Sequence, residues 1–151
     1  YKGRGNENEW GCKYSDTIDK IMSAELSVIQ DEYDRAIHGE YAGSVLARGW
    51  REVDKFWIGL RSSFPAAKFS IEHQIGRQDE NMPPRAALRW ILEGKHDGWG
   101  VFGKPTGADV YIMGMAHVEY GALVTGIPKI RKEYVLYDEV AIWKQILLKT
   151  G

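Results

Sequence analysis

The sequence is poor in the features that mark exported and membrane-spanning proteins. Among its 151 residues there is one cysteine, Cys12, so an internal disulfide is excluded and a reducing compartment is expected. No apolar run approaches the roughly 18 residues that a membrane-spanning helix needs. The first five residues are polar and lack the apolar stretch of a signal peptide. We therefore expect a cytoplasmic protein that does not contact membranes.

Charge of one sign is not concentrated in any part of the sequence. The chain has 20 basic and 21 acidic residues and no block of either kind. Proteins that bind nucleic acids or anionic membrane surfaces usually carry a basic patch or stripe. We therefore expect neither nucleic acid nor a membrane as a partner.

Motifs for metals and nucleotides are missing as well. Four histidines and one cysteine include no pair at metal-ligand spacing, so no metal site is expected. Gly98, Gly100 and Gly103 imitate a dinucleotide fingerprint, but a true one follows a strand and opens a helix, whereas this one joins two strands. The P-loop pattern and the G-x-S-x-G elbow are absent. We expect no cofactor.

The length and the order of predicted elements indicate one α+β domain. Residues 1–14, rich in Gly, Asn and Glu, are expected to form an irregular arm, and residues 15–151 a single domain. The chain begins without Met, which agrees with either a processed product or a piece of a longer protein.

Helical and strand patterns divide this domain. After a cap at Ser15, apolar residues continue at helical spacing as far as Tyr33, with a break near Ser27 as the alternative. Residues 39–49 are expected to form a loop, and a clean apolar stripe predicts a helix from Trp50 to Phe64. Four strands of an antiparallel meander follow at 68–77, 85–96, 109–120 and 129–137, with breaks at 81–84, 94–107 and 121–128. Asp138 reads as the N-cap of a final helix. Helices are therefore expected to pack on one face of a curved sheet.

Several local strings give this order a family likeness. They are Ser63-Phe64-Pro65, Arg89-Trp90-Ile91-Leu92-Glu93-Gly94-Lys95-His96-Asp97-Gly98, Phe102-Gly103-Lys104-Pro105-Thr106-Gly107, Ile130-Arg131-Lys132-Glu133-Tyr134, Asp138 and Gln145. With these strings the chain resembles the nuclear transport factor 2-like (NTF2-like) superfamily, in particular its SnoaL-like branch, which includes polyketide cyclases. The resemblance covers residues 50–148.

The resemblance implies a cone-shaped α+β barrel in which the helices and the curved sheet enclose an apolar pocket. It also implies a homodimer formed through the outer face of the sheet. Relatives include cyclases, isomerases, epoxide hydrolases and dehydratases, but also plain binding domains, so the fold does not fix the activity. The expected function is to bind or transform a hydrophobic cyclic small molecule by metal-free acid–base chemistry. The alternative is a non-catalytic ligand-binding or dimerisation domain.

The resemblance also indicates where a catalytic carboxylate would lie. Cofactor-free cyclases and epoxide hydrolases of the superfamily place an aspartate three residues before the one that starts the last helix, and here that position is Val135. Valine cannot transfer a proton, so whether the chain is an enzyme stays open. Glu133 could replace the aspartate if the register shifts, although a solvated carboxylate beside Arg131 and Lys132 is the preferred interpretation.

Four residues are candidates for acid–base chemistry. His117 is expected to act as the base or to polarise a carbonyl, with Asp138 or Glu119 as its partner and Tyr134 as a hydrogen-bond donor. The simpler alternatives are a structural or dimer-contact role for His117 and an N-cap role for Asp138.

Aromatic and sulfur-containing residues are the candidates for ligand contacts. They are Phe56, Trp57, Trp90, Trp99, Met113, Met115 and His96. A stripe of this kind usually belongs to a core, but in a fold with a cavity part of the core must line it. For His96, pinning of the glycine-rich loop is the preferred interpretation.

Overall fold

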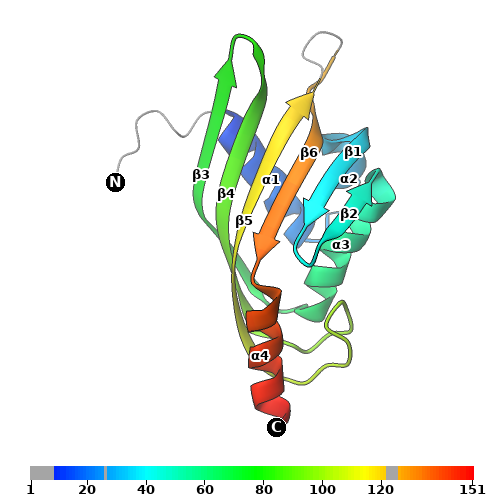
Figure 1. Ribbon diagram of the computed structural model, residues 1–151, viewed down its shortest axis with the longest axis vertical. Coiled ribbons are helices and arrows are strands. Elements are labelled where there is room, and N and C mark those ends of the chain that lie inside the picture. The colour runs from blue at the N-terminus through cyan, green and yellow to red at the C-terminus, as the bar shows by residue number, and fades with distance from the viewer. Residues whose placement is uncertain (1–8, 26, 122–125) are drawn as a thin grey trace.

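The computed structural model describes residues 9–25, 27–121 and 126–151, and these form an α+β fold (Figure 1). The elements in chain order are α1 (Glu9–Met22), α2 (Val28–Glu32), β1 (Tyr33–Tyr41), β2 (Val45–Arg48), α3 (Trp50–Ser63), β3 (Lys68–Asp79), β4 (Met82–Lys95), β5 (Asp109–Gly121), β6 (Lys129–Tyr137) and α4 (Glu139–Thr150).

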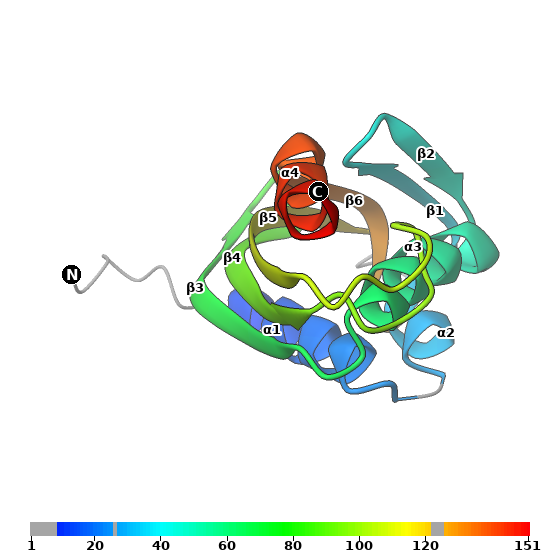
Figure 2. The same cartoon turned by 90° about the horizontal axis from the view of Figure 1, so that it is seen from below.

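The strands form one curved sheet in the order β2-β1-β6-β5-β4-β3. Strands β3 to β6 make the antiparallel meander expected from the sequence, while β1 joins β6 in parallel and pairs with β2 in a hairpin. The sheet curves around α1 and α3, which lie on its concave side (Figure 2), and α4 extends beyond one end of the sheet (Figure 1). The expected α+β class with N-terminal helices on a curved sheet is thus confirmed.

The N-terminal third differs from the sequence-based expectation. Helix α1 begins at Glu9, so residues 9–14 of the expected irregular arm are helical, and residues 1–8 of that arm lie outside the described residues. The α1 segment is amphipathic, and it buries Trp10 and Tyr14 against the sheet. The Gly, Asn and Glu content of the segment predicts an irregular arm. Burial of these two aromatic side chains stabilises a helix there instead.

A second difference concerns residues 33–48. The helical spacing that continues to Tyr33 is divided between α1, which ends at Met22, and the short α2, whose N-cap is Ser27, so the alternative of a break near Ser27 is confirmed. The expected loop at 39–49 is largely the β1–β2 hairpin. Inward-facing Tyr33, Ile37 and Tyr41 of β1 pack in the core, and pairing with β6 holds the strand in place. That partner lies about a hundred positions away in the chain, beyond the reach of any local pattern. Residues 122–125 of the expected break at 121–128 lie outside the described residues.

The C-terminal elements follow the expectation closely. Helix α3 begins at Trp50 and ends before Phe64, as its stripe and Pro65 predict. The Asp138 carboxylate accepts a hydrogen bond of 3.0 Å from the backbone N–H of Ala141, so the predicted N-cap of α4 is confirmed.

The core lies between the concave sheet face, α1 and α3. Its largest fully buried side chains are Trp57, Trp90, Tyr14, Tyr33, Tyr120 and Phe64. None of the helices in the described residues is long and apolar enough to cross a membrane.

Candidate functional site

A single carboxylate lies at the centre of the core. Glu133 of β6 is completely buried, with no exposed surface. The register between β5 and β6 shifts at this point, because Glu119 pairs with Lys132 while the next residue, Tyr120, pairs with Ile130. The extra residue, Arg131, points outward with Lys132, and Glu133 turns inward. The interpretation of Glu133 as a solvated carboxylate is therefore wrong.

Four donors from three other elements meet at this carboxylate. Oε2 accepts from the hydroxyls of Tyr14 in α1, at 2.9 Å, and Tyr33 in β1, at 2.5 Å. Oε1 accepts from the hydroxyl of Tyr41, at 2.8 Å, and from the indole N–H of Trp57 in α3, at 3.1 Å. These five residues form the Glu133 cluster. Two bonds to each oxygen use about all the acceptor sites of an ionised carboxylate.

Burial and hydrogen bonding act in opposite directions on this carboxyl group. Loss of solvent raises the pKa of Glu133, and the four hydrogen bonds oppose that shift without cancelling it. The pKa values of Tyr14, Tyr33 and Tyr41 are raised above the ordinary value. Burial is the largest cause, and the negative charge of Glu133 is the second. The tyrosines therefore remain neutral donors at neutral pH, and the carboxyl group of Glu133 keeps its proton to higher pH than an exposed glutamate does.

Aromatic rings separate the Glu133 cluster from the protein surface. The rings of Tyr41 and Phe56 stack with centroids 3.9 Å apart, and Phe56 is 6.4 Å from Tyr137. Tyr137 in turn meets the edge of Trp90 at 6.2 Å. Tyr137 is the part-exposed member of this set, and burial raises its pKa to about 12. Ring contacts therefore connect the part-exposed Tyr137 through Phe56 to Tyr41, which bonds to Glu133.

Two inward-facing positions have no side chain and make room for these rings. A Cβ on Gly39 would lie 2.6 Å from the Tyr41 hydroxyl, so glycine allows that ring to reach Glu133. A Cβ on Gly114 would overlap the ring of Trp90. The Trp90 indole N–H is buried without a hydrogen-bond partner among the described residues, which leaves a donor in the core for another group.

The structure brings some of the predicted ligand-contact residues together and separates others. Phe56, Trp57 and Trp90 line the concave side, and Val135 lies there too, two residues from Glu133. Met113 and Met115 instead face outward on β5, with 55% and 61% of their surfaces exposed.

The residues predicted for acid–base chemistry lie away from the Glu133 cluster. His117, Glu119 and Tyr134 are on the convex outer face of the sheet, where the rings of His117 and Tyr134 are 5.9 Å apart. Burial lowers the pKa of His117, opposed by the charge of Glu119, whose carboxylate lies 3.6 Å from the Lys132 ammonium. Asp138 caps α4. His117 and Tyr134 thus lie close together, but on the outer face of the sheet.

The two remaining candidates flank the glycine-rich loop. His96 is buried, and its backbone carbonyl accepts from Thr106 and Gly107 while Nδ1 lies 3.0 Å from the Thr106 hydroxyl. This agrees with loop pinning. Burial lowers its pKa, which favours the neutral ring. Trp99 is 69% exposed.

Within the described ranges, no three His, Cys, Asp or Glu side chains gather closely enough to hold a metal ion.

Comparison with solved structures identifies the architecture. A protein assigned to the SnoaL-like polyketide cyclases, from Jannaschia sp. CCS1, matches with a TM-score of 0.69 at 14% identity, over 93% of this chain and 96% of its own. The chain has the SnoaL-like fold. AclR from Streptomyces galilaeus, assigned as a hydroxylase, matches at 0.66 and 17% over 91% of this chain and 98% of its own.

A third solved structure is similar over most of its length. IdmH from Streptomyces antibioticus, assigned as a polyketide cyclase, gives a TM-score of 0.63 and 16% identity over 87% of this chain and 96% of its own. No protein-family model and no curated protein sequence matches the chain. The predicted relation to the SnoaL-like branch of the NTF2-like proteins is confirmed at the level of the fold.

Proposed function

We propose that this SnoaL-like protein binds a hydrophobic cyclic small molecule inside the cone and transforms it by acid–base chemistry at Glu133. The observation that supports this most directly is the buried carboxylate with three tyrosine hydroxyls and an indole N–H around it. Glu133 lies on the same inner face as Val135, the position that the family resemblance gives to a catalytic aspartate. A buried carboxyl group with a raised pKa is suited to take up and return a proton.

Tyr41 is the donor best placed to change partner. Tyr14 and Tyr33 have no exposed surface, whereas Tyr41 is 3% exposed and stacks on Phe56 at the solvent side of the cluster. When a ligand enters past Phe56 and Tyr137, the Tyr41 hydroxyl can donate to a ligand carbonyl oxygen. Glu133 then removes a proton from the carbon next to that carbonyl, and the return of this proton at another carbon completes an isomerisation. In a cyclisation, the enolate carbon instead attacks a second carbonyl carbon of the ligand, whose C=O double bond becomes an alkoxide, and Glu133 returns the proton to that oxygen.

The test combines binding with turnover. Thermal shifts are measured against aromatic polyketides, terpenoids, terpenoid epoxides and steroids, and each hit is followed by mass spectrometry. A ligand at 100 times its Kd stabilises the protein by about 2.7 kcal/mol, which is readily detected. Conversion that is lost in Glu133→Gln and Tyr41→Phe but retained in Tyr134→Phe supports the proposal. Tyr134 is the matched control because its ring lies on the outer face. Conversion that persists in both interior variants would refute it.

A non-catalytic binding domain is the second candidate. It is favoured by Val135 and by the complete hydrogen bonding of Glu133, which leaves no acceptor site free in the absence of a ligand. In that case ligands bind the wild type and Glu133→Gln alike, and no product forms with any of them.

We also propose that the protein forms a homodimer through the outer face of its sheet. Apolar side chains are exposed there on neighbouring strands: Tyr111, Met113 and Met115 of β5, and Leu136 of β6, which pairs with Met115. A continuous exposed apolar patch on a sheet is typical of a protein interface. His117 lies on the same face, where its ring would contribute a polar contact.

A further inference from the structure

A second concave surface lies apart from the Glu133 cluster. It is a groove of about 630 Å³ between α1, α2, α3 and the β1–β2 strands, and it shares no lining residue with the cluster. Such a volume falls within the range of small-molecule sites. Its apolar floor is formed by Ile21, Val28, Ile29, Trp50 and Ile58.

The walls of this groove carry an excess of positive charge, although the whole chain is nearly neutral. Four arginines line it, Arg35, Arg48, Arg51 and Arg61, against two carboxylates, Glu25 and Asp54. None of the ion pairs among the described residues involves any of these four guanidinium groups. Uncompensated guanidinium groups above an apolar floor favour an anion that also has an apolar part.

Two of these arginines are already held in position. The Arg35 guanidinium lies over the Trp50 ring, 5.6 Å from its centroid, and the Trp50 indole N–H donates to the Tyr33 carbonyl at 2.8 Å. The Arg61 guanidinium donates to the Ile21 carbonyl. Since arginine has five N–H donors, both groups keep donors for a ligand.

The backbone at the groove is strained. Three non-glycine residues in the described part of the chain have a positive φ, and two of them, Ala24 (61°) and Ser27 (72°), line this groove. Strained residues of this kind concentrate at ligand-binding sites.

We propose that this groove binds a small amphipathic organic anion. Its apolar body would lie on the isoleucine and Trp50 floor, and its carboxylate, phosphate or sulfate head would accept hydrogen bonds from the guanidinium groups. The three head groups share the oxyanion that arginine recognises. Because the groove and the cone have separate linings, this binding does not depend on the interior site.

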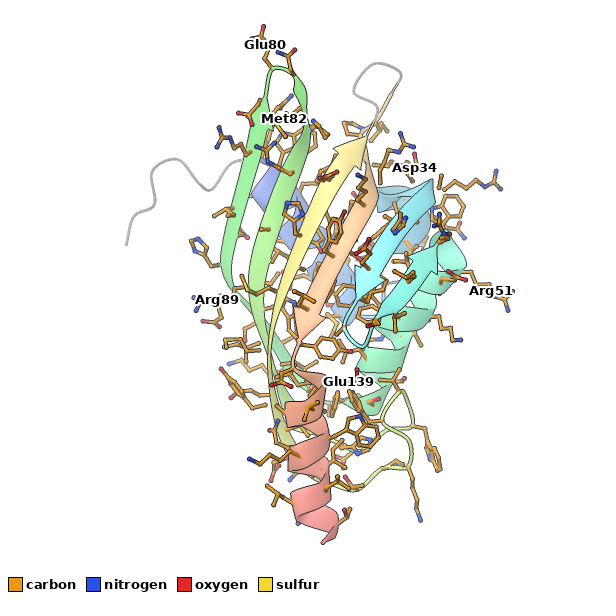
Figure 3. All side chains as sticks on the ribbon, viewed as in Figure 1. Asp34, Arg51, Glu80, Met82, Arg89 and Glu139 are labelled. Atoms are coloured by element: carbon orange, nitrogen blue, oxygen red, sulfur yellow. The ribbon has the colours of Figure 1, made fainter. Side chains whose placement is uncertain are left out.

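The probes are octanoate, octyl phosphate and octyl sulfate, with 1-octanol as the uncharged analogue. Binding is followed by backbone and indole NMR shifts of the full 17.2 kDa chain, which locate the ligand. Arg48 and Arg51 are exchanged together for glutamine, since both are exposed and their guanidinium groups make no hydrogen bond among the described residues. Arg89→Gln is the matched control. It removes an exposed arginine on β4, on the opposite side of the molecule from Arg51 (Figure 3).

Saturable shifts at Trp50 and α2 with at least one of the anions are expected. The variant Arg48→Gln/Arg51→Gln should bind that anion about tenfold more weakly than the wild type does. The wild type should bind 1-octanol no more tightly than this variant binds the anion. Arg89→Gln should behave as the wild type. The head group that binds best identifies the ligand class. The proposal is overturned if none of the anions produces saturable shifts at the groove. Equal affinity for 1-octanol, or an unchanged affinity in Arg48→Gln/Arg51→Gln, would overturn it too.

Discussion

The hydroxyl of Tyr33 donates a hydrogen bond of 2.5 Å to the Glu133 carboxylate, from the first residue of β1 to the middle of β6. Both residues are fully buried, and 100 positions separate them in the chain. The parallel pairing of β1 with β6 sets this contact. It connects the stability of the N-terminal part of the fold to the chemistry of the proposed site.

Removing this donor should destabilise the protein. Tyr33→Phe leaves a buried carboxylate oxygen with one hydrogen bond fewer, at a cost of about 1–3 kcal/mol in the free energy of unfolding. Urea denaturation measures the change. The control is Tyr134→Phe, whose half-buried hydroxyl has no hydrogen bond among the described residues and should change stability by less than about 0.5 kcal/mol. Equal effects of the two variants would contradict the arrangement.

Filling the space beneath Tyr41 should displace its hydroxyl from Glu133. The new Cβ of Gly39→Ala would lie 2.6 Å from the Tyr41 hydroxyl, closer than atoms pack. We expect a loss of about 1–3 kcal/mol in stability, the range for overpacking a core. In a Tyr41→Ala background the same change should cost much less. A double-mutant cycle in urea measures the difference, and additive effects would show that the two residues do not interact.

The pH dependence of stability should reveal the state of Glu133. Burial raises its pKa in the folded protein, so the folded state binds the proton more tightly than the unfolded chain. The stability that this tighter proton binding by Glu133 contributes is therefore fully present below the unfolded pKa of about 4.3. It is lost as pH rises through the raised pKa of the folded state. The stability of the wild type relative to Glu133→Gln should fall from pH 4 upward.

Denaturation of the wild type and of Glu133→Gln at a series of pH values measures this difference in stability. The other carboxylates are the same in both proteins, so their effects on the pH dependence cancel. If the relative stability of the wild type instead rises with pH, the hydrogen bonds outweigh the loss of solvent and the pKa of Glu133 is lowered.

Loss of the N-cap at Asp138 should destabilise the protein through the first turn of α4. Asp138→Ala removes the acceptor of the Ala141 N–H and should cost about 1 kcal/mol. Asp138→Asn keeps an acceptor and should restore most of that loss. Thermal unfolding measures stability, and amide exchange in the first turn of α4 shows where the protection is lost. A failure of asparagine to restore stability would indicate a role beyond capping.

The outer face offers a test of association. Met115→Glu places a charge in the middle of the exposed apolar patch, beside Leu136 on the neighbouring strand. A homodimer formed through this face should dissociate, which sedimentation or light scattering detects as a halving of the mass. Asp97→Asn, an exposed change on the glycine-rich loop, is the control. A wild type that is monomeric at high concentration would contradict the proposed dimer.

Local sequence patterns determined much of the C-terminal two thirds of the fold. The stripe of α3, the alternation of β5 and the cap at Asp138 depend on neighbours within a few positions, so periodicity finds them. The period-two alternation of β5 puts Met113, Met115 and His117 on one face of the strand. It could not tell which face the helices cover. The other face, with Ile112, Ala116 and Val118, packs in the core.

Tertiary structure alone decided the candidate site. Tyr14, Tyr33 and Tyr41 lie 119, 100 and 92 positions from Glu133, and no local spacing relates them to it. Beside Arg131 and Lys132, Glu133 resembles a solvated charge until the register shift in β6 turns it inward. A buried carboxylate needs donors from several directions. Those donors come from α1, β1 and α3 only once the sheet has curved around the helices and β1 has paired with β6.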